Sequence, residues 1–206
     1  AAKKFKDAYS QNPTFIPSAL AHANALIKRE KCVKATEVIK NAWRIKPHPG
    51  LVEPFCLGSE AKDELAVLKA THRLVFANRD HPESLIALAR AALGARLWGE
   101  ARTHLKALTP EHDTHEEARV CRLWAKLEES ENQDIAASQN WLTQASLASG
   151  DPAWICGTCG NAVIEWSVLC GNCGRFATLN WDRPRHVSRQ TLSGAENNMA
   201  LAITND

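Results

Sequence analysis

Apolar residues recur every three or four positions from Thr14 to Gly150, a spacing that places them on one face of an α-helix. Alanine and leucine are abundant in this stretch, whereas runs of β-branched residues are scarce. Both features favour helix, because Ala and Leu are among the residues with the highest helix propensity. The pattern predicts a mainly α-helical domain over residues 1–150.

Small residues within this segment repeat at a fixed interval. Three pairs of alanines are twelve residues apart: Ala23 and Ala35, Ala89 and Ala101, and Ala125 and Ala137. Alanines at this separation let two antiparallel helices approach closely, with one alanine on each helix. Pro13 and Pro47, 34 residues apart, indicate the period. We therefore expect a row of helical hairpins, of which the second combines residues 49–57 and 63–77 without a matching alanine pair.

This arrangement of alanines and prolines resembles the tetratricopeptide repeat, whose period is about 34 residues. The clearest unit begins near Pro82 and includes Ala89, Trp98, Ala101 and Leu105. The resemblance implies a solenoid of helical hairpins with a concave groove that binds protein segments. A plain helical bundle is the alternative.

Three polar residues fall on the groove side if the repeat has this phase: Asn24, Lys28 and Arg90. They are candidates for contact with a protein partner, and ordinary solvated surface is the competing interpretation. The histidines of the helical segment, among them His72 and His104, show no metal-ligand spacing such as H-E-x-x-H. We predict that these histidines are surface or core residues.

The pattern changes after Gly150. Asp151 and Pro152 end the helical segment, and short apolar runs at 162–166 and 176–181 predict strands, each after a pair of cysteines. A unit of about 30 residues is too small to be stable through apolar burial alone. The sequence predicts a zinc-ribbon or rubredoxin-like module over residues 151–185.

Four cysteines form two C-G-x-C-G hooks: Cys156, Cys159, Cys170 and Cys173. The glycine that ends each hook, Gly160 or Gly174, permits the positive φ that such a turn needs. Two hooks that face each other complete a tetrahedral shell of sulfurs, which leaves no open position for a substrate. The pattern predicts a structural metal site.

Zinc is the preferred ion for these hooks, because a closed thiolate shell suits Zn²⁺ without any redox partner. Iron is the alternative, since rubredoxins hold iron with the same hooks. The ten-residue spacer between the hooks is shorter than in a typical rubredoxin, which favours zinc.

The module carries three tryptophans that it cannot bury alone: Trp154, Trp166 and Trp181. We expect them to dock the module on the last pair of helices, near Trp141. The alternative is an exposed platform that stacks nucleic-acid bases. The arginines that would supply charge to it are Arg175, Arg183, Arg185 and Arg189. A net charge of only +2 favours proteins as partners, and no nucleic acid is expected.

The chain has 206 residues, of which 45% are hydrophobic, enough for one main core and a small module. The sequence contains no run of about 18 apolar residues, the pattern that predicts a membrane span. Paired hooks beside isolated cysteines indicate a reducing compartment. The polar residues 186–206 lack periodicity and are expected to form a disordered tail.

Helical repeats followed by such hooks resemble the C-terminal part of bacterial HemY-like proteins. The resemblance rests on W-x-C-x2-C-G and C-x2-C-G-x-F-x-T-L-x-W around the cysteines, and on A-W-R-I-K-P-H-P at 42–49. HemY-like proteins are inner-membrane proteins associated with haem biosynthesis. The resemblance implies a scaffold on the cytoplasmic face of the bacterial inner membrane, attached through an N-terminal anchor that would lie outside this sequence. Its partners would be biosynthetic enzymes or membrane proteins.

A second family, the LapB-like regulators of lipopolysaccharide assembly, is similar in plan. Its members act as adaptors that link a biosynthetic enzyme to a membrane protease. The F-x-T-L-x-W continuation fits the HemY-like family better. Neither resemblance supplies catalytic residues, and the chain shows no nucleophile–base pair, phosphate loop or open metal site. We therefore expect a scaffold without enzymatic activity, and a rubredoxin-like electron carrier is the further alternative.

Overall fold

The computed structural model describes residues 2–108 and 117–184, so the predicted tail at 186–206 lies outside the described residues. The helices are α1 (Ala2–Gln11), α2 (Ile16–Ile27), α3 (Cys32–Ile45), α4 (Val52–Gly58), α5 (Glu64–Val75), α6 (Pro82–Gly94), α7 (Trp98–Lys106), α8 (Ala118–Asn132) and α9 (Ile135–Leu147). Short 3₁₀ turns are η1 (Pro49–Leu51) and η2 (Phe76–Asn78). The strands are β1 (Ala153–Cys156), β2 (Ala162–Val163) and β3 (Leu179–Asp182). The predicted fold class, mainly helical with a small β module at the end, is confirmed at this level.

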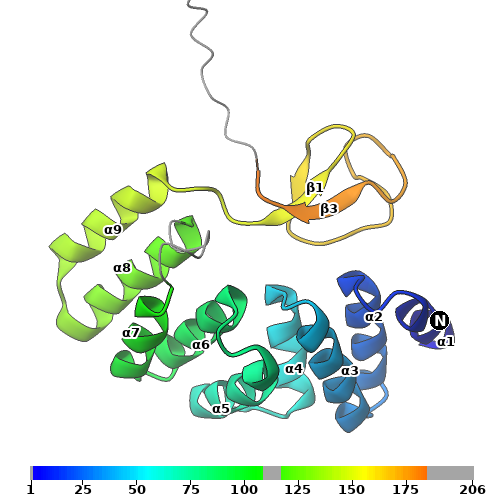
Figure 1. Ribbon diagram of the computed structural model, residues 1–206, viewed down its shortest axis with the longest axis horizontal. Helices are drawn as coiled ribbons and strands as arrows, with labels where there is room; N and C mark the ends of the chain where they lie inside the picture. Colours follow the sequence, from blue (N-terminus) through cyan, green and yellow to red (C-terminus); the bar gives the residue numbers. More distant parts are fainter. Residues whose placement is uncertain (1, 109–116, 185–206) are drawn as a thin grey trace, which may run out of the picture.

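Consecutive helices pack as hairpins, which stand side by side in a curved row (Figure 1). The hairpins are α2 with α3, α4 with α5, α6 with α7 and α8 with α9. The second hairpin occupies the segment predicted at 49–57 and 63–77, although that segment has no alanine pair. No helix among the described residues is long and apolar enough to cross a bilayer.

The four hairpin turns share a backbone feature that is absent from the sequence pattern. Each contains one residue other than glycine with φ between 53° and 57°: Glu30, Glu60, Arg96 and Gln133. In three of the turns the next N–H donates to the carbonyl five residues back, as Leu97 does to Ala92 at 2.9 Å. This is the hydrogen bond of a Schellman motif, in which glycine usually takes the left-handed position. The turns therefore repeat in structure without a repeated glycine.

The alanine pairs lie where two helices approach each other. Ala23, Ala35, Ala89 and Ala101 are fully buried. The third pair differs, because Ala125 is buried on α8 whereas its counterpart on α9 is half-buried. The helix α9 covers α8 from one side and buries little of its own surface.

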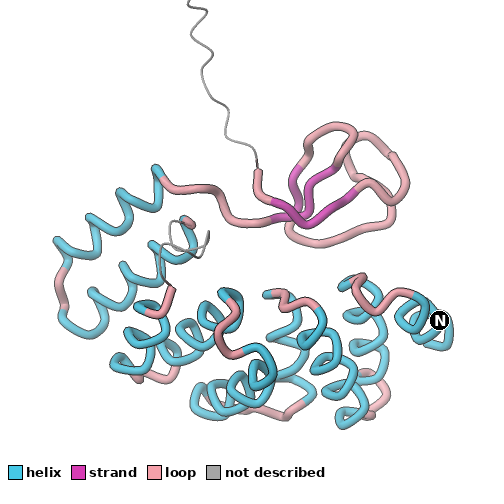
Figure 2. Tube along the Cα trace, in the orientation of Figure 1, coloured by secondary structure: helices cyan, strands magenta, loops and turns pink. Residues whose placement is uncertain are grey.

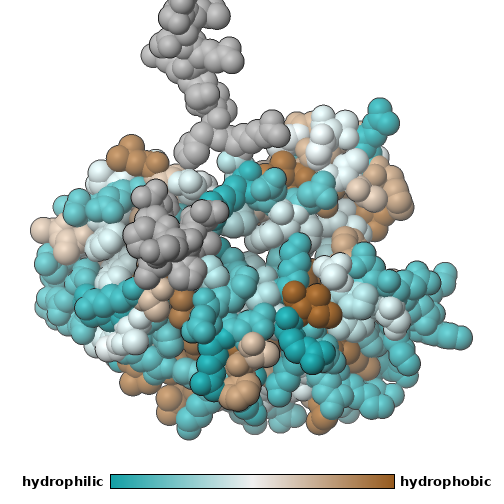
Figure 3. Space-filling view, viewed as in Figure 1, coloured by the Kyte–Doolittle hydropathy of each residue, from teal (hydrophilic) through white to brown (hydrophobic). Residues whose placement is uncertain are grey.

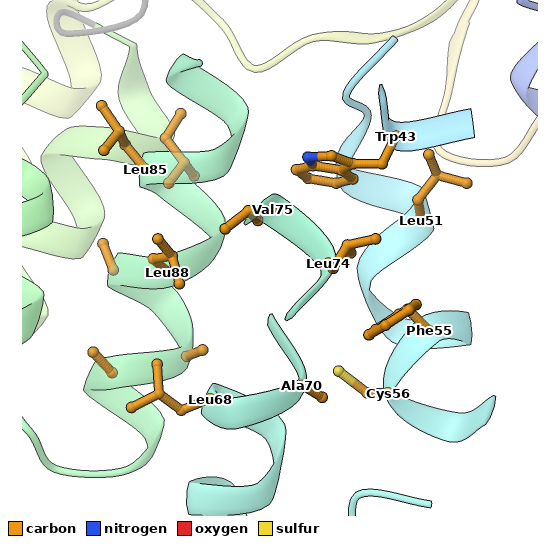
Figure 4. Packing of buried hydrophobic residues seen from close by; sticks show 14 of the residues in the cluster. Trp43, Leu51, Phe55, Cys56, Leu68, Ala70, Leu74, Val75, Leu85 and Leu88 are labelled. Carbon is orange, nitrogen blue, oxygen red and sulfur yellow. The ribbon is translucent and has the colours of Figure 1, made fainter. Parts of the chain in front are cut away.

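A continuous apolar core runs through the row from Ile16 on α2 to Leu127 on α8. Figure 4 shows how α5 packs between its neighbours. Leu74 points toward α4, and Val75 points toward Leu88 on α6. The face seen in Figure 3 is mostly hydrophilic with scattered apolar residues, as is normal for a protein surface.

The small sheet has β1 in the centre, antiparallel to both β2 and β3. Trp154 on β1 pairs with Val163 on one side and with Trp181 on the other. The strands are short and most of the module is loop (Figure 2). The strand predicted at 162–166 ends at 163, where the chain bends. The one predicted at 176–181 is found at 179–182, because Ala177 has a φ of 52° that interrupts the extended backbone.

Candidate metal centre

The two cysteine hooks have the same backbone conformation. The first follows β1, where the Cys156 carbonyl accepts a hydrogen bond from the Gly160 N–H at 2.9 Å. In the second, the Cys170 carbonyl accepts one from the Gly174 N–H at 2.8 Å. The two glycines have φ of 73° and 67°, the left-handed region that glycine adopts without strain. The expected role of both glycines is confirmed.

The hooks face each other and bring four sulfurs together. All four Sγ atoms lie within 4.8 Å of one another. The Sγ atoms of Cys156 and Cys173 are 3.7 Å apart, as are those of Cys159 and Cys170. A tetrahedral ion with bonds of about 2.3 Å to sulfur requires sulfurs about 3.8 Å apart, whereas a disulfide requires about 2.05 Å. The spacing fits one tetrahedral metal ion.

The thiols of the cluster differ in acidity. A hydrogen bond with Thr178 lowers the pKa of Cys156 to about 5, and the backbone N–H of Cys173 lowers the pKa of Cys170. The Arg175 N–H favours the thiolate of Cys173, yet burial and the neighbouring sulfurs outweigh it and raise the pKa of this thiol to about 11. Crowded thiols cannot all ionise without a compensating positive charge. A bound cation would supply that charge.

Two polar side chains contact the sulfurs from outside the cluster. Thr178 Oγ1 lies 3.1 Å from Cys156 Sγ, and Asn172 Nδ2 donates to Cys159 Sγ at 3.6 Å. Such contacts orient thiolate ligands and adjust their charge. Zinc and iron both accept four sulfurs in this geometry, so the donor set is compatible with either ion.

The three tryptophans of the module lie close to the first hairpin. Trp154 and Trp181 pack edge to face with ring centroids 5.3 Å apart, and Trp181 lies 4.3 Å from the His48 ring. Trp166 contacts Phe15 edge to face at 5.2 Å. Phe15 immediately precedes α2, and His48 follows α3. The module thus returns to the N-terminal end of the helical row, as Figure 1 shows.

The expected location near Trp141 is therefore wrong. Trp141 on α9 stacks on Trp124 of α8, with ring centroids 5.4 Å apart and the planes only 11° from parallel. Each ring covers the other within the last hairpin. An extended connection, residues 148–152, separates α9 from β1 and leads the chain toward the opposite end of the row (Figure 1).

His48 lies at the centre of the contact between the module and the first hairpin. It is 3% exposed, and its Nδ1 accepts a hydrogen bond from the Gly50 N–H at 3.0 Å. Burial lowers the pKa of His48 to about 4, and the positive charge of Lys46 acts in the same direction. At neutral pH the ring is uncharged, which suits its position against Trp154 and Trp181.

A chain of ion pairs forms a second contact between the module and the helices. Glu117 directly precedes α8 and is fully buried. Its Oε1 accepts a hydrogen bond at 2.6 Å from Arg183, which follows β3. Arg119 binds the same carboxylate and also donates to Glu83 of α6 at 2.9 Å. Each buried charge in this chain is paired, as burial of ionised groups requires.

The tryptophans and arginines considered for a nucleic-acid platform are partly used in these contacts. Arg183 is paired with Glu117, and Trp154 is buried. Arg185 and Arg189 lie outside the described residues.

The candidate groove residues are not all brought together. Arg90 on α6 lines a cavity of about 350 Å³, together with residues of α4 and α5. Asn24 and Lys28 are exposed near the end of α2 and do not line this cavity. The assignment of all three to one partner surface stays a prediction, and the cavity contains only Arg90 of the three.

No family model matches the chain. A curated protein of Magnetospirillum gryphiswaldense, described as "Probable magnetosome protein Mms48", is 30% identical over 182 residues. The match covers 86% of this chain, and the chain spans 39% of the relative's length. The crystal structure of MamA overlaps with a TM-score of 0.39 at 12% identity, over 71% of this chain and 85% of MamA. With so loose an overlap, the fold description rests on the hairpins themselves.

Sequence reasoning did not identify the helical residues that receive the module. His48 belongs to the A-W-R-I-K-P-H-P segment at 42–49. This segment supported the family resemblance, but it did not indicate that His48 contacts the module. Phe15 and Glu117 belong to no motif. Glu117 meets its partner Arg183 across 66 positions of the chain, a separation that no local pattern encodes.

Proposed function

We propose that this chain is a non-enzymatic scaffold for protein interactions, with tetratricopeptide-like hairpins and a structural zinc ion held by Cys156, Cys159, Cys170 and Cys173. The observation that carries the scaffold role is the open cavity formed where α4, α5 and α6 meet. Successive hairpins of a solenoid leave such concave spaces for segments of partner proteins.

The lining of this cavity indicates the chemistry of a partner. Its walls are largely apolar, with Val52 and Ile86 among them, and charged groups of both signs border it, including Lys62, Glu64 and Arg90. An apolar side chain from an extended protein segment would fill the centre while polar groups of the segment meet the charges. We therefore favour a protein segment with mixed charge as the occupant.

The role of the cavity can be tested by comparing two arginine variants. Arg90→Ala should weaken capture of protein partners at least several-fold while leaving the melting temperature unchanged, because Arg90 is exposed at the cavity. Arg29→Ala is the matched control, since Arg29 is exposed outside the cavity. Quantitative capture with both variants and the parent chain measures the difference. Equal capture by all three would contradict the proposed role of this cavity.

The zinc ion is proposed to have a structural role. Four thiolates complete a tetrahedral shell, so a bound ion has no free position for a substrate or for water. This is also the basis for proposing that the chain lacks enzymatic activity at this centre. Elemental analysis combined with a visible spectrum tests the assignment, because stoichiometric iron with a reversible redox signal would favour the electron-carrier alternative.

For the cellular role we propose a scaffold on the cytoplasmic face of the bacterial inner membrane, within a HemY-like protein associated with haem biosynthesis. The motif residues around the hooks and at 42–49 support it. A LapB-like adaptor of lipopolysaccharide assembly is the alternative on the same residues. A magnetosome scaffold is a further candidate, since the 30% identical relative is described as a probable magnetosome protein.

Cell fractionation with affinity capture separates these candidates. Haem-pathway enzymes in the captured fraction would support the HemY-like assignment, and an envelope-lipid enzyme or protease would support the LapB-like one. Co-purification with isolated magnetosomes would support the third candidate.

A further inference from the structure

Three side chains that are distant in the sequence meet on the surface of the helical row. His72 lies in the last turn of α5, and Glu100 and His104 lie on α7. Glu100 and His104 are four positions apart, so they share one face of that helix. The potential ligand atoms of these three residues all lie within 4.8 Å of one another.

The carboxylate of Glu100 lies between the two imidazoles. Its Oε1 is 2.6 Å from His72 Nε2 and 3.5 Å from His104 Nε2. The two rings approach each other with centroids 6.1 Å apart. The side chains become more buried in the order His72, Glu100, His104, with 48%, 30% and 17% exposed. The cluster is therefore open to solvent on the His72 side and enclosed on the His104 side.

The imidazole of His104, the more buried of the two rings, has an incomplete set of hydrogen bonds. The Nε2 atom of His104 is buried and, apart from the long 3.5 Å contact with Glu100, has no hydrogen-bond partner among the described residues. A buried polar nitrogen without a partner costs free energy. A simple ion pair between His72 and Glu100 would leave this cost in place, whereas a cation bound by both rings would remove it.

We propose that His72, Glu100 and His104 form a second metal site, which binds a divalent transition-metal ion of the zinc class. Two imidazole nitrogens and one carboxylate oxygen are a common donor set for such ions. A tetrahedral zinc ion needs these donors about 3.4 Å apart. The 3.5 Å between His104 and Glu100 already matches this spacing, whereas the 2.6 Å between His72 and Glu100 has to lengthen by about 0.8 Å.

This site differs in chemistry from the cysteine cluster. Nitrogen and oxygen donors hold the ion in place of sulfur, and three protein ligands leave one position of a tetrahedral shell for water. The ion would also join α5 of one hairpin to α7 of the next. The second site therefore binds an exchangeable ion and fixes the junction between two hairpins.

The experiment counts the zinc that the full chain retains after dialysis against micromolar Zn²⁺. The parent chain should retain one equivalent more than His72→Gln or Glu100→Gln. Because the result is a difference, it does not depend on how much zinc the cysteines hold. His81→Asn is the matched control, since it removes an exposed histidine outside the cluster and keeps a capping side chain for α6.

A second readout observes the ligands directly. The imidazole nitrogen resonances of His72 and His104 should shift together as Zn²⁺ is added, and should do so in the Cys156→Ser variant as well. Equal zinc content in the parent chain and both cluster variants would overturn the proposal. A shift of His72 without His104 would also overturn it, because it would indicate binding to a single surface ring.

Discussion

In the helical row, buried apolar side chains extend without interruption from Ile16 to Leu127, whereas the module's buried cluster consists of Trp154, Leu179 and two of its cysteines. A small module with so little apolar burial would depend on the proposed metal ion for its stability. The row, with several stacked hairpins, depends on packing. The comparison predicts that the two parts share a contact surface and are nevertheless stabilised in different ways.

The largest expected effect separates these two sources of stability. Cys156→Ser should abolish tight metal binding and unfold the module, because structural zinc sites contribute on the order of 10 kcal/mol to folding. The helical signal in circular dichroism should remain, since the core of the row lies elsewhere. Metal content and amide resonances of β1 and β3 measure the loss.

Cys32→Ser is the control for this experiment, because Cys32 is half-buried at the start of α3 and far from the hooks in sequence. It should retain both metal and module. Loss of the helical signal in Cys156→Ser together with loss of the module would break the distinction between the two regions.

A smaller effect tests the contact between the regions. His48 has its pKa lowered from 6.5 to about 4 in the folded protein, so the unfolded chain binds a proton at a higher pH than the folded chain. The contribution of the neutral His48 ring to the free energy of unfolding is fully present above pH 6.5. It is lost as the pH falls toward 4, by up to about 3 kcal/mol. His48→Asn keeps a cap for η1 and should flatten this dependence.

Urea unfolding of the parent chain and His48→Asn across this pH range gives the comparison. Carboxylates also titrate here, so the difference between the two proteins is the informative quantity. Parallel pH profiles for the parent chain and His48→Asn would show that the buried ring does not couple the regions.

The smallest expected effect concerns the hairpin turns of the row. Arg96 has a φ of 57°, which costs a residue with a Cβ atom about 1 kcal/mol. Arg96→Gly should remove this strain and raise the free energy of unfolding by about 0.5 kcal/mol, after the entropy of the more flexible unfolded chain is included. The neighbouring Ala95 has a φ of −76°, so Ala95→Gly should destabilise the protein. Urea midpoints that move the same way in both variants would contradict this explanation.

The helices and the cysteine hooks could be predicted because their signals are local. Apolar spacing and alanine pairs mark helices within a few turns, and each hook is contained in five residues that end in glycine. The turn residues could not be predicted, since Glu60 and Arg96 occupy positions where glycine is the usual signal. Local patterns thus identify elements better than they identify irregular backbone.

The arrangement of the module could not be predicted because it depends on pairs distant in sequence. Trp166 meets Phe15, and Trp181 meets His48. An aromatic ring that needs covering has no sequence feature that specifies which end of the row will cover it. The same limit applies to His72 and Glu100, which come from different hairpins and show no ligand spacing along the chain.

The return of the module to the first hairpin has a mechanical consequence for the helical row. In an open stack of hairpins, small bending motions at successive interfaces add up, so the two ends fluctuate most relative to each other. Here the segment that follows α9 packs against residues that flank α2 and α3. The distance between the ends is thereby fixed, and bending at one interface has to be compensated at another. The curvature of the helical row therefore depends on all of its hairpin interfaces and on the contact with the module together.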